Sequence, residues 1–317
     1  MNEKYNHGVR VQEEGTDIAP PINGTSGLQV VVGTAPVNLA ENPGAVVNVP
    51  VLCSSMADAR SRLGYCEDFE RYTLCQSIYA SFLVYGVAPV VFINVLDPEK
   101  HKKKNEVKEC RVLNGQAVVE GVTGILKESV TVKAGEETFI VNNDYLMSFN
   151  AKGELVISML SDQALAAASV KVESESIDPD AVTKEDIIGG YDVVTGKESG
   201  LEVLRQVYPR TGIAPAILLA PGWSHDPEVG AVIISKCEYI NGVFESECLL
   251  DLDTTKTRLY TDVPKVKEES GYHDKHAIVV WPMVVADGRK IYYSAMVGAM
   301  AQYIDASNDN VPSLYLS

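Results

Sequence analysis

Long apolar stretches are missing from this chain of 317 residues. No run approaches the roughly 20 apolar residues that are needed to cross a bilayer. Residues 1–15 also lack the apolar segment of a secretory signal peptide. These two absences predict a cytosolic protein that does not insert into membranes, and the length allows about two domains of ordinary size.

Basic residues are scarce. The chain has 27 Lys and Arg against 43 Asp and Glu, which gives a formal net charge of −16. Nucleic-acid surfaces need clustered Lys and Arg to displace counterions, so this balance disfavours DNA or RNA as a partner. The one basic run, His101–Lys104, stands beside Asp97 and Glu99. We predict that this run is a solvated loop.

Metal-binding motifs are not evident either. The six cysteines form no CxxC pair and have no histidine at zinc-ligand spacing: Cys53, Cys66, Cys75, Cys110, Cys237 and Cys248. In a chain without a signal peptide this pattern predicts reduced, half-buried thiols. His273 and His276 lie in a polar segment without further ligands nearby, so we expect both to be exposed. The sequence therefore predicts no metal, no cofactor and no catalytic residue.

The sequence does contain an alternation of strand-like and helix-like segments. Apolar, β-branched runs predict strands at 28–32, 46–52, 89–96, 216–220, 248–252, 277–281 and 291–293. Apolar residues at helical spacing predict helices at 67–85, 199–208, 227–240 and 294–306. This alternation predicts an α/β core with a mixed, largely parallel sheet.

Three of these helices carry a start signal. Ser199 and Glu202 have the spacing of a capping box. Asp226 precedes Pro227, which suits the first helical position because proline has no N–H to leave unpaired. Ser294 is the third predicted cap.

Between about 101 and 175 the chain changes character. Short β-rich runs occur at 116–122, 129–133, 138–141 and 155–160, and only 161–168 has a helical pattern. Asn150–Gly153 is typical of a hairpin turn. We therefore predict a small all-β domain inserted into the α/β core. The predicted division is an extended arm at 1–25, core at 26–96, the inserted β-rich domain at 97–182 and the rest of the core at 183–317.

Four motifs resemble those of contractile tail sheath proteins from myophages, R-type pyocin-like particles and related injection systems. Ala220–Pro227 resembles the family's APG-aromatic-SHDP turn. Asp186–Gly190 with Gly200–Glu202 is similar to its D-I-I-G-G … G-L-E lead. Ser294, Ala301 and Asp305 are similar to its S … A … D helix. The arm motif is matched by His7–Val9, Ile18–Pro21 and Gly33–Ala35. Each motif alone is weak, but four in the correct order make a strong case.

The resemblance implies a structural subunit rather than an enzyme. Such subunits polymerise as stacked rings around an inner tail tube and contract to drive the tube through a cell envelope. Extended arms would add strands to a neighbour's sheet. The implied partners are further sheath subunits, the tail tube, the baseplate and the tail terminator. The implied location is the tail of a virion or phage-tail-like particle, assembled in the bacterial host cytoplasm. The family's carboxy-terminal domain is expected to be absent, because the chain stops at Ser317.

One enzymatic alternative remains open. Asp251 and Asp253 resemble the DxDxT loop of haloacid-dehalogenase phosphatases, which would make the chain an α/β phosphatase or hydrolase. That chemistry also needs a downstream lysine and an acidic pair holding magnesium. The competing interpretation is a strand end with two solvated carboxylates. A related baseplate component on the same fold is a third possibility.

Ser224, His225 and Asp226 have the residue types of a catalytic triad but are adjacent in sequence. Adjacent side chains diverge, and triads assemble from distant segments. The structural interpretation is that Asp226 caps a helix and that the turn presents Trp223.

Overall fold

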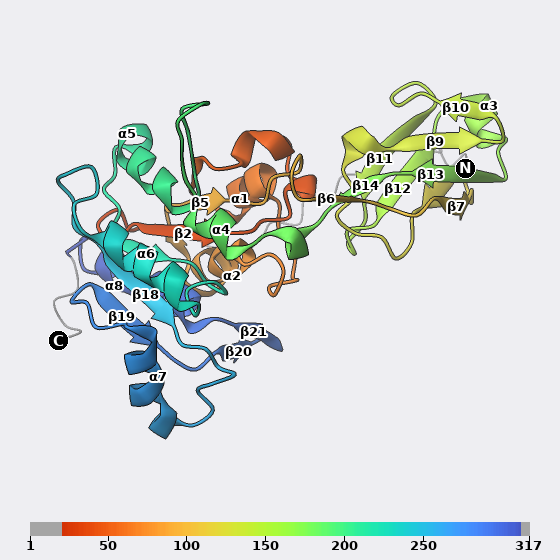
Figure 1. The fold of residues 1–317 in the computed structure, drawn as a ribbon. Helices are drawn as coiled ribbons and strands as arrows, with labels where there is room; N and C mark the ends of the chain where they lie inside the picture. Colours follow the sequence, from red (N-terminus) through yellow and green to blue (C-terminus); the bar gives the residue numbers. More distant parts are fainter. Residues whose placement is uncertain (1–20, 312–317) are drawn as a thin grey trace, which may run out of the picture.

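A computed structural model describes residues 21–311 (Figure 1). Its largest sheet consists of β2 (Gln29–Gly33), β3 (Pro50–Cys53), β5 (Val90–Asn94), β17 (Ile217–Leu219), β18 (Glu247–Asp251) and β19 (Ala277–Val280). The strand order is β19-β18-β17-β2-β5-β3. Every neighbouring pair is parallel except β5 and β3. The central strands are continuous apolar runs because helices cover both of their faces.

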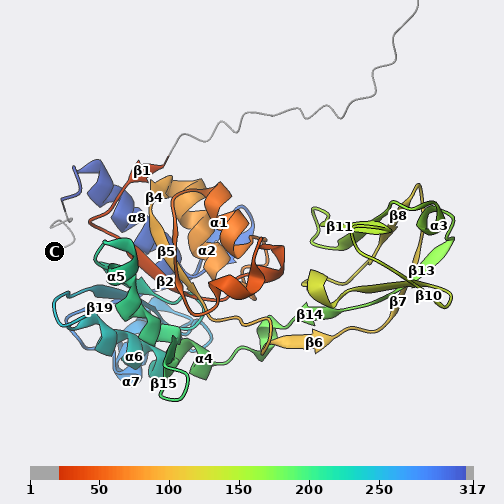
Figure 2. The same ribbon diagram turned by 90° about the horizontal axis from the view of Figure 1, so that it is seen from above.

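Helices lie on both sides of this sheet (Figures 1 and 2). One face is covered by α2 (Leu74–Tyr79), its π-helical continuation Ala80–Tyr85, and α8 (Tyr293–Ser307). The opposite face is covered by α4 (Lys184–Ile188), the 3-10 helix Gly200–Gln206, α5 (Val207–Thr211) and α6 (Pro227–Cys237). Helix α1 (Met56–Leu63) packs beside β3, and α7 (Val263–Ser270) lies between β18 and β19 in the chain. Together these elements enclose the larger hydrophobic cluster.

Between β5 and α4 the chain forms a separate β-rich unit (Figure 2). Its strands are β7 (Lys108–Arg111), β8 (Gln116–Val118), β9 (Thr131–Ala134), β10 (Glu137–Phe139), β11 (Tyr145–Phe149), β12 (Leu155–Met159) and β13 (Ser169–Glu173). They form two antiparallel sheets, ordered β10-β9-β13-β7 and β11-β12-β8. The short helix α3 (Asp162–Leu165) follows β12. The unit has its own hydrophobic cluster and is joined to the core by the ribbon of β6 (Lys102–Lys104) and β14 (Glu175–Ile177).

Three further strand pairs lie outside the central sheet of the core. They are the parallel pair β1 (Ile22–Asn23) with β4 (Val87–Ala88), and the hairpins β15 (Gly190–Asp192) with β16 (Lys197–Ser199) and β20 (Val284–Ala286) with β21 (Arg289–Ile291). Residues 1–20 of the predicted arm lie outside the described residues, and its last part contains β1. Within 21–311 no helix has the length and apolarity to cross a bilayer.

Most predicted strands have a counterpart in the structure, and the Asp226 cap is confirmed, since its side chain accepts a hydrogen bond from the Glu228 N–H. The other two caps were wrong. Ser199 makes no capping bond, and the segment after it is a 3-10 helix. Ser294 lies inside α8, whose cap position is Tyr292.

The predicted helix at 67–85 begins only at Leu74, because Thr34 at the end of β2 binds the preceding residues. The Thr34 hydroxyl donates to the Arg71 carbonyl at 2.7 Å, and the Leu74 N–H donates to the Thr34 carbonyl at 3.0 Å. Helix α7 was missed, because its charged sequence VPKVKEES contains too few apolar residues for a helical pattern.

We predict that the β-rich unit depends on its own cluster. Leu155 is fully buried on β12, whereas Leu146, on the paired strand β11, is 46% exposed. Leu155→Ala should lower the free energy of unfolding by about 2–5 kcal/mol because it leaves a cavity. The matched control Leu146→Ala should change it by less than about 1 kcal/mol. Urea unfolding monitored by circular dichroism measures both, and equal losses would contradict the packing described here.

Candidate functional site

Asp251 lies at the carboxyl end of β18 and connects three segments. Its carboxylate accepts hydrogen bonds from the Ser294 N–H at 3.0 Å and the Ser294 hydroxyl at 2.5 Å, both in the first turn of α8. The Ser224 hydroxyl also donates to this carboxylate at 3.3 Å and accepts from the Asp251 N–H at 3.1 Å. Asp251 therefore joins the central sheet to the 220–227 turn and to the start of α8.

The Asp251 side chain is buried, which corrects the expectation of a solvated carboxylate. Burial raises the pKa of Asp251 to about 6, against the lowering effect of the hydrogen bonds from Ser294 and Ser224. The N-terminus of α8 favours negative charge, but burial outweighs this effect as well and keeps the pKa raised.

Asp253 lies two residues further on and has different partners. Its carboxylate accepts from the Thr255 N–H at 2.8 Å and the Thr255 hydroxyl at 2.6 Å, and Lys256 lies 3.6 Å away. Partial burial raises the pKa of Asp253, but the Thr255 bonds outweigh it and hold the pKa below its usual range. Among the described residues, no group of three His, Cys, Asp or Glu side chains is arranged to hold a metal ion. The magnesium cluster that the phosphatase alternative needs is thus not formed in this part of the chain.

The side chains of the Ser224-His225-Asp226 turn point to three different partners. Ser224 contacts Asp251, Asp226 caps α6, and the His225 ring stacks on Tyr292 with 5.9 Å between ring centroids and 4° between planes. Burial lowers the pKa of His225. These partners do not form a proton relay, and the turn acts as a packing element.

Trp223 and Tyr272 complete the surroundings of this turn. Trp223 is partly buried against the larger hydrophobic cluster. The Tyr272 hydroxyl donates to the Ser224 carbonyl at 2.7 Å and also reaches the Asp226 carbonyl at 3.3 Å. A Cβ on Gly230 would lie 2.3 Å from the Tyr272 hydroxyl oxygen. Glycine in α6 therefore allows the tyrosine to reach the turn.

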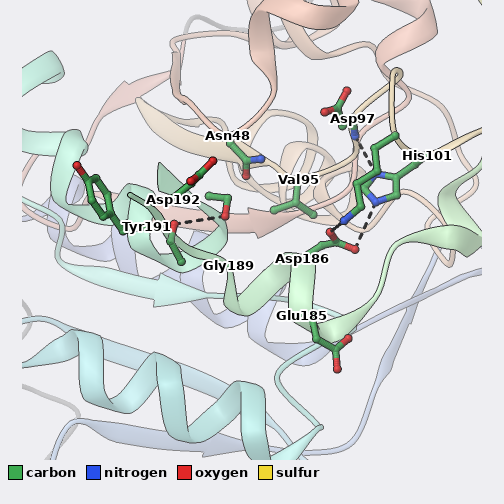
Figure 3. Close-up of a pocket in the computed structure, with 12 residues that line it drawn as sticks. Asn48, Val95, Asp97, His101, Glu185, Asp186, Gly189, Tyr191 and Asp192 are labelled. Carbon is green, nitrogen blue, oxygen red and sulfur yellow. Dashed lines mark hydrogen bonds and ion pairs between the residues drawn. The ribbon is translucent and has the colours of Figure 1, made fainter. Parts of the chain in front are cut away.

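A surface pocket of about 480 Å³ lies where the chain leaves the core for the β-rich unit and returns to it (Figure 3). The buried ring of His101 stands between Asp97 and Asp186 there. Its Nδ1 accepts from the Asp97 N–H at 3.0 Å, so the proton of a neutral ring lies on Nε2, which faces an Asp186 carboxylate oxygen at 3.3 Å. Residues before and after the β-rich unit thus meet at one buried contact.

Acidic residues lie close to Lys100 and to two lysines of the 101–104 run. Lys100 pairs with Asp186, Lys102 with Glu175 at 3.2 Å, and Lys103 with Asp178 at 3.1 Å. The solvated-loop prediction was wrong, because His101 is buried and Lys102–Lys104 is strand β6. Carboxylates therefore face Lys102 and Lys103 of this strand.

The two remaining histidines differ from each other. His273 is exposed, as predicted, but His276 is buried just before β19, where its carbonyl accepts from the Cys248 N–H at 2.9 Å. All six cysteines are free thiols, and only Cys66 is half-buried rather than fully buried.

Gln302 is an important residue that was not predicted from the sequence. Its side-chain N–H groups donate to the carbonyls of Gly24 and Pro89, both at 2.7 Å, and its carbonyl accepts from Gln29 at 2.6 Å. It therefore connects α8 to the first described residues of the chain. A glutamine in a mostly apolar helical segment is a sequence signal that could have indicated this role.

No protein-family model matches this chain. It is 28% identical over 252 residues to a tail sheath protein of Burkholderia phage BcepMu. The chain is similar to a phage tail sheath protein. This relative confirms the resemblance inferred from the four motifs. The matched region covers 76% of the chain and 49% of the relative, so the chain spans about half the length of that sheath protein.

We predict an unusual pH dependence from Asp251. Because its folded pKa is above the value of about 4 in an unfolded chain, protonation favours the folded state. Its contribution to stability is full below pH 4 and is lost as the pH rises through about 6. Between these limits the free energy of unfolding of the wild type should fall by on the order of 2–3 kcal/mol relative to that of Asp251→Asn.

Chemical denaturation from pH 4 to 8 measures this difference. Asp253→Asn is the control: the folded pKa of Asp253 is lowered, so its contribution to stability is lost only as the pH falls below about 4 and stays nearly constant over this range. Parallel pH curves for wild type and Asp251→Asn would show that the carboxylate is not held as described.

Proposed function

We propose that this chain is the structural subunit of a contractile tail sheath. The observation that carries the proposal is its similarity over 252 residues to a phage tail sheath protein. In this role the subunit polymerises as stacked rings around an inner tail tube, and the rings contract to drive the tube through a cell envelope. It acts in the virion tail after assembly in the host cytoplasm, with the tail tube, baseplate and tail terminator proteins as further partners.

The motifs that carry the resemblance meet in space, which supports a shared architecture. Ser224 of the APGWSHDP turn and Ser294 of the last helix both bind Asp251. In the D-I-I-G-G lead, a Cβ on Gly189 would lie 1.9 Å from the Ser199 carbonyl oxygen. The matched residues are thus needed for packing, as expected of a structural protein.

We further propose that the two hydrophobic clusters correspond to two domains. The larger cluster belongs to the α/β core at 26–96 and 183–317, and the smaller one to a β-rich domain inserted at 97–182. In a sheath the β-rich domain would face outward, and the core would make the contacts between subunits.

An open edge of the central sheet supports assembly through added strands. Within the described residues, β19 pairs only with β18, and its Ile278 side chain is 38% exposed. The free edge of such a parallel strand offers backbone N–H and carbonyl groups to a strand from another chain. The first described residues are held to α8 by Gln302, so an amino-terminal arm would leave from a fixed point.

We predict that a charge on this edge will block assembly while the fold remains intact. Ile278→Lys adds a solvated cation to β19, whereas the matched control Val285→Lys places one on β20 at a site that is 69% exposed. In a phage complementation assay with the full-length gene, the β19 variant should reduce intact tails at least tenfold, and the control should not. Equal tail counts by electron microscopy would show that the edge takes no strand.

Immunogold labelling of particles tests the function itself and separates it from its alternatives. Antibody against this chain should decorate the whole length of the tail. Labelling confined to the distal end would indicate a baseplate component instead. A magnesium-dependent phosphatase activity that disappears in Asp251→Asn and Asp253→Asn would overturn the structural role.

A further inference from the structure

The β15–β16 hairpin ends in an apolar tip that the core does not use. Figure 2 shows this hairpin at the edge of the core, close to α4. Val193 and Val194 form the tip and are 83% and 89% exposed, more than any other large apolar side chain among residues 21–311. Neither valine belongs to a hydrophobic cluster. Two adjacent apolar side chains held in water in this way mark an interaction site.

The shape of the tip is fixed by its own hydrogen bonds. The Asp192 carboxylate accepts from the Val194 N–H at 2.8 Å and from the Thr195 hydroxyl at 2.6 Å. The Gly196 N–H donates to the Asp192 carbonyl at 2.8 Å, and Gly196 has a φ of 68°, which glycine adopts without strain. A tip that is already ordered loses little conformational freedom when it binds.

The base of the hairpin is fixed to the core as well. The Gly200 N–H, directly after β16, donates to the Asn48 side chain at 2.9 Å. The Arg205 guanidinium lies over the Tyr191 ring, 5.6 Å from its centroid, and pairs with Glu198 at 2.6 Å. The core therefore presents the two valines in one direction.

A pocket of about 690 Å³ lies elsewhere on the molecule, between the core and the turn 150–153 of the β-rich unit. Its apolar lining consists of Pro36, Leu39, Tyr65 and Ala151, among other residues. The volume is within the range of roughly 300–1,000 Å³ that is typical of ligand pockets. The pocket is therefore large enough for the two valine side chains of a hairpin tip.

Charged residues of this pocket complement the tip. Arg60 and Lys152 line it, and within residues 21–311 neither forms a salt bridge. The two acids of the same lining are already engaged, since Glu67 pairs with Arg289 and Asp68 lies 3.9 Å from Arg71. Two unpaired cations thus remain.

The tip supplies the matching anion. Asp192 stands beside the two valines and also has no salt bridge within 21–311. Lys197, opposite Asp192 on β16, has a long side chain that can keep its charge in water. The pocket of Figure 3 fits the tip less well, because Asp97 and Asp186 would repel the Asp192 carboxylate.

We propose that the Val193–Val194 tip of one copy of this chain inserts into the 690 Å³ pocket of a second copy. Tip and pocket share no residue, so each copy offers its tip to one neighbour and its pocket to another. Such a heterologous contact repeats from copy to copy and builds open helical assemblies. The inference rests on the proposed sheath function and adds a contact between subunits that is separate from the β19 edge.

Photo-cross-linking in intact tails tests the contact. The full-length gene with p-benzoylphenylalanine in place of Val194 is expressed in the phage complementation assay, and assembled tails are irradiated. We expect cross-links between copies that join the hairpin to 36–39, 65–68 or 150–153. The same probe in place of Val285, which is 69% exposed on β20, should not label these segments. Cross-links from position 194 only to other segments, or none between copies, would overturn the proposal.

Variants test the contact from both sides. Replacing both valines (Val193→Ser with Val194→Ser) should reduce intact tails about tenfold or more, because the tip then has less apolar surface to bury. Ala151→Trp should have the same effect, since the larger side chain fills the pocket from an exposed turn. The matched control Val285→Ser should assemble normally. All these positions are exposed or, like Val285, on a hairpin surface, so thermal unfolding by circular dichroism should match the wild type.

The outcomes separate this inference from the proposed function. Normal tail numbers for both variants, with antibody decorating the whole length of the tail, would overturn the tip contact and leave the sheath function in place. Tails that the antibody does not decorate along their length would overturn both.

Discussion

The carboxylate of Asp251 is the interaction on which the core depends most. A buried acid is costly unless its oxygens are hydrogen-bonded. Here both oxygens are used, one by the Ser294 N–H and the other by the hydroxyls of Ser294 and Ser224. The residues that satisfy it come from a turn after β17 and from the last helix. One side chain thus sets the position of α8 relative to the sheet.

A second set of polar contacts holds the other end of α8. Gln302 bridges the helix to the carbonyls of Gly24 and Pro89 and to the side chain of Gln29. The last described helix is therefore bonded to segments near the start of the chain as well as to β18. For the sheath subunit proposed above, such connections would keep the core rigid while neighbouring subunits move.

The base of the β-rich unit is built differently, from a two-stranded ribbon and a group of paired charges. His101 and Lys100 before the unit both contact Asp186 after it. Burial raises the pKa of Asp186, but the bonds from Lys100 and the Thr183 N–H outweigh it and hold the pKa low. Exposed ion pairs contribute little individually. The ribbon and the buried His101 contact therefore define the junction more strongly than the lysines do.

Local pattern alone determined several of the core elements of this protein. Apolar runs and helical spacing located β2, β5, β18 and α6, because strand and helix periodicity depends only on neighbouring residues. The Asp226–Pro227 cap was identified for the same reason. The four motifs likewise indicated a tail sheath before any contact was known, and the relative confirmed that resemblance.

Only the tertiary structure decided which polar side chains are buried. Asp251 was expected in solvent at a strand end, and His101 and His276 in polar segments, but all three side chains are buried. Asp251 binds Ser224 and Ser294, and His101 faces Asp186, so these two side chains meet segments far away in the chain, which no local pattern can reveal. The cap at Ser294 failed for this reason, since its hydroxyl binds Asp251 across 43 residues instead of its own helix. Long-range burial, and not local propensity, thus gives these residues their roles.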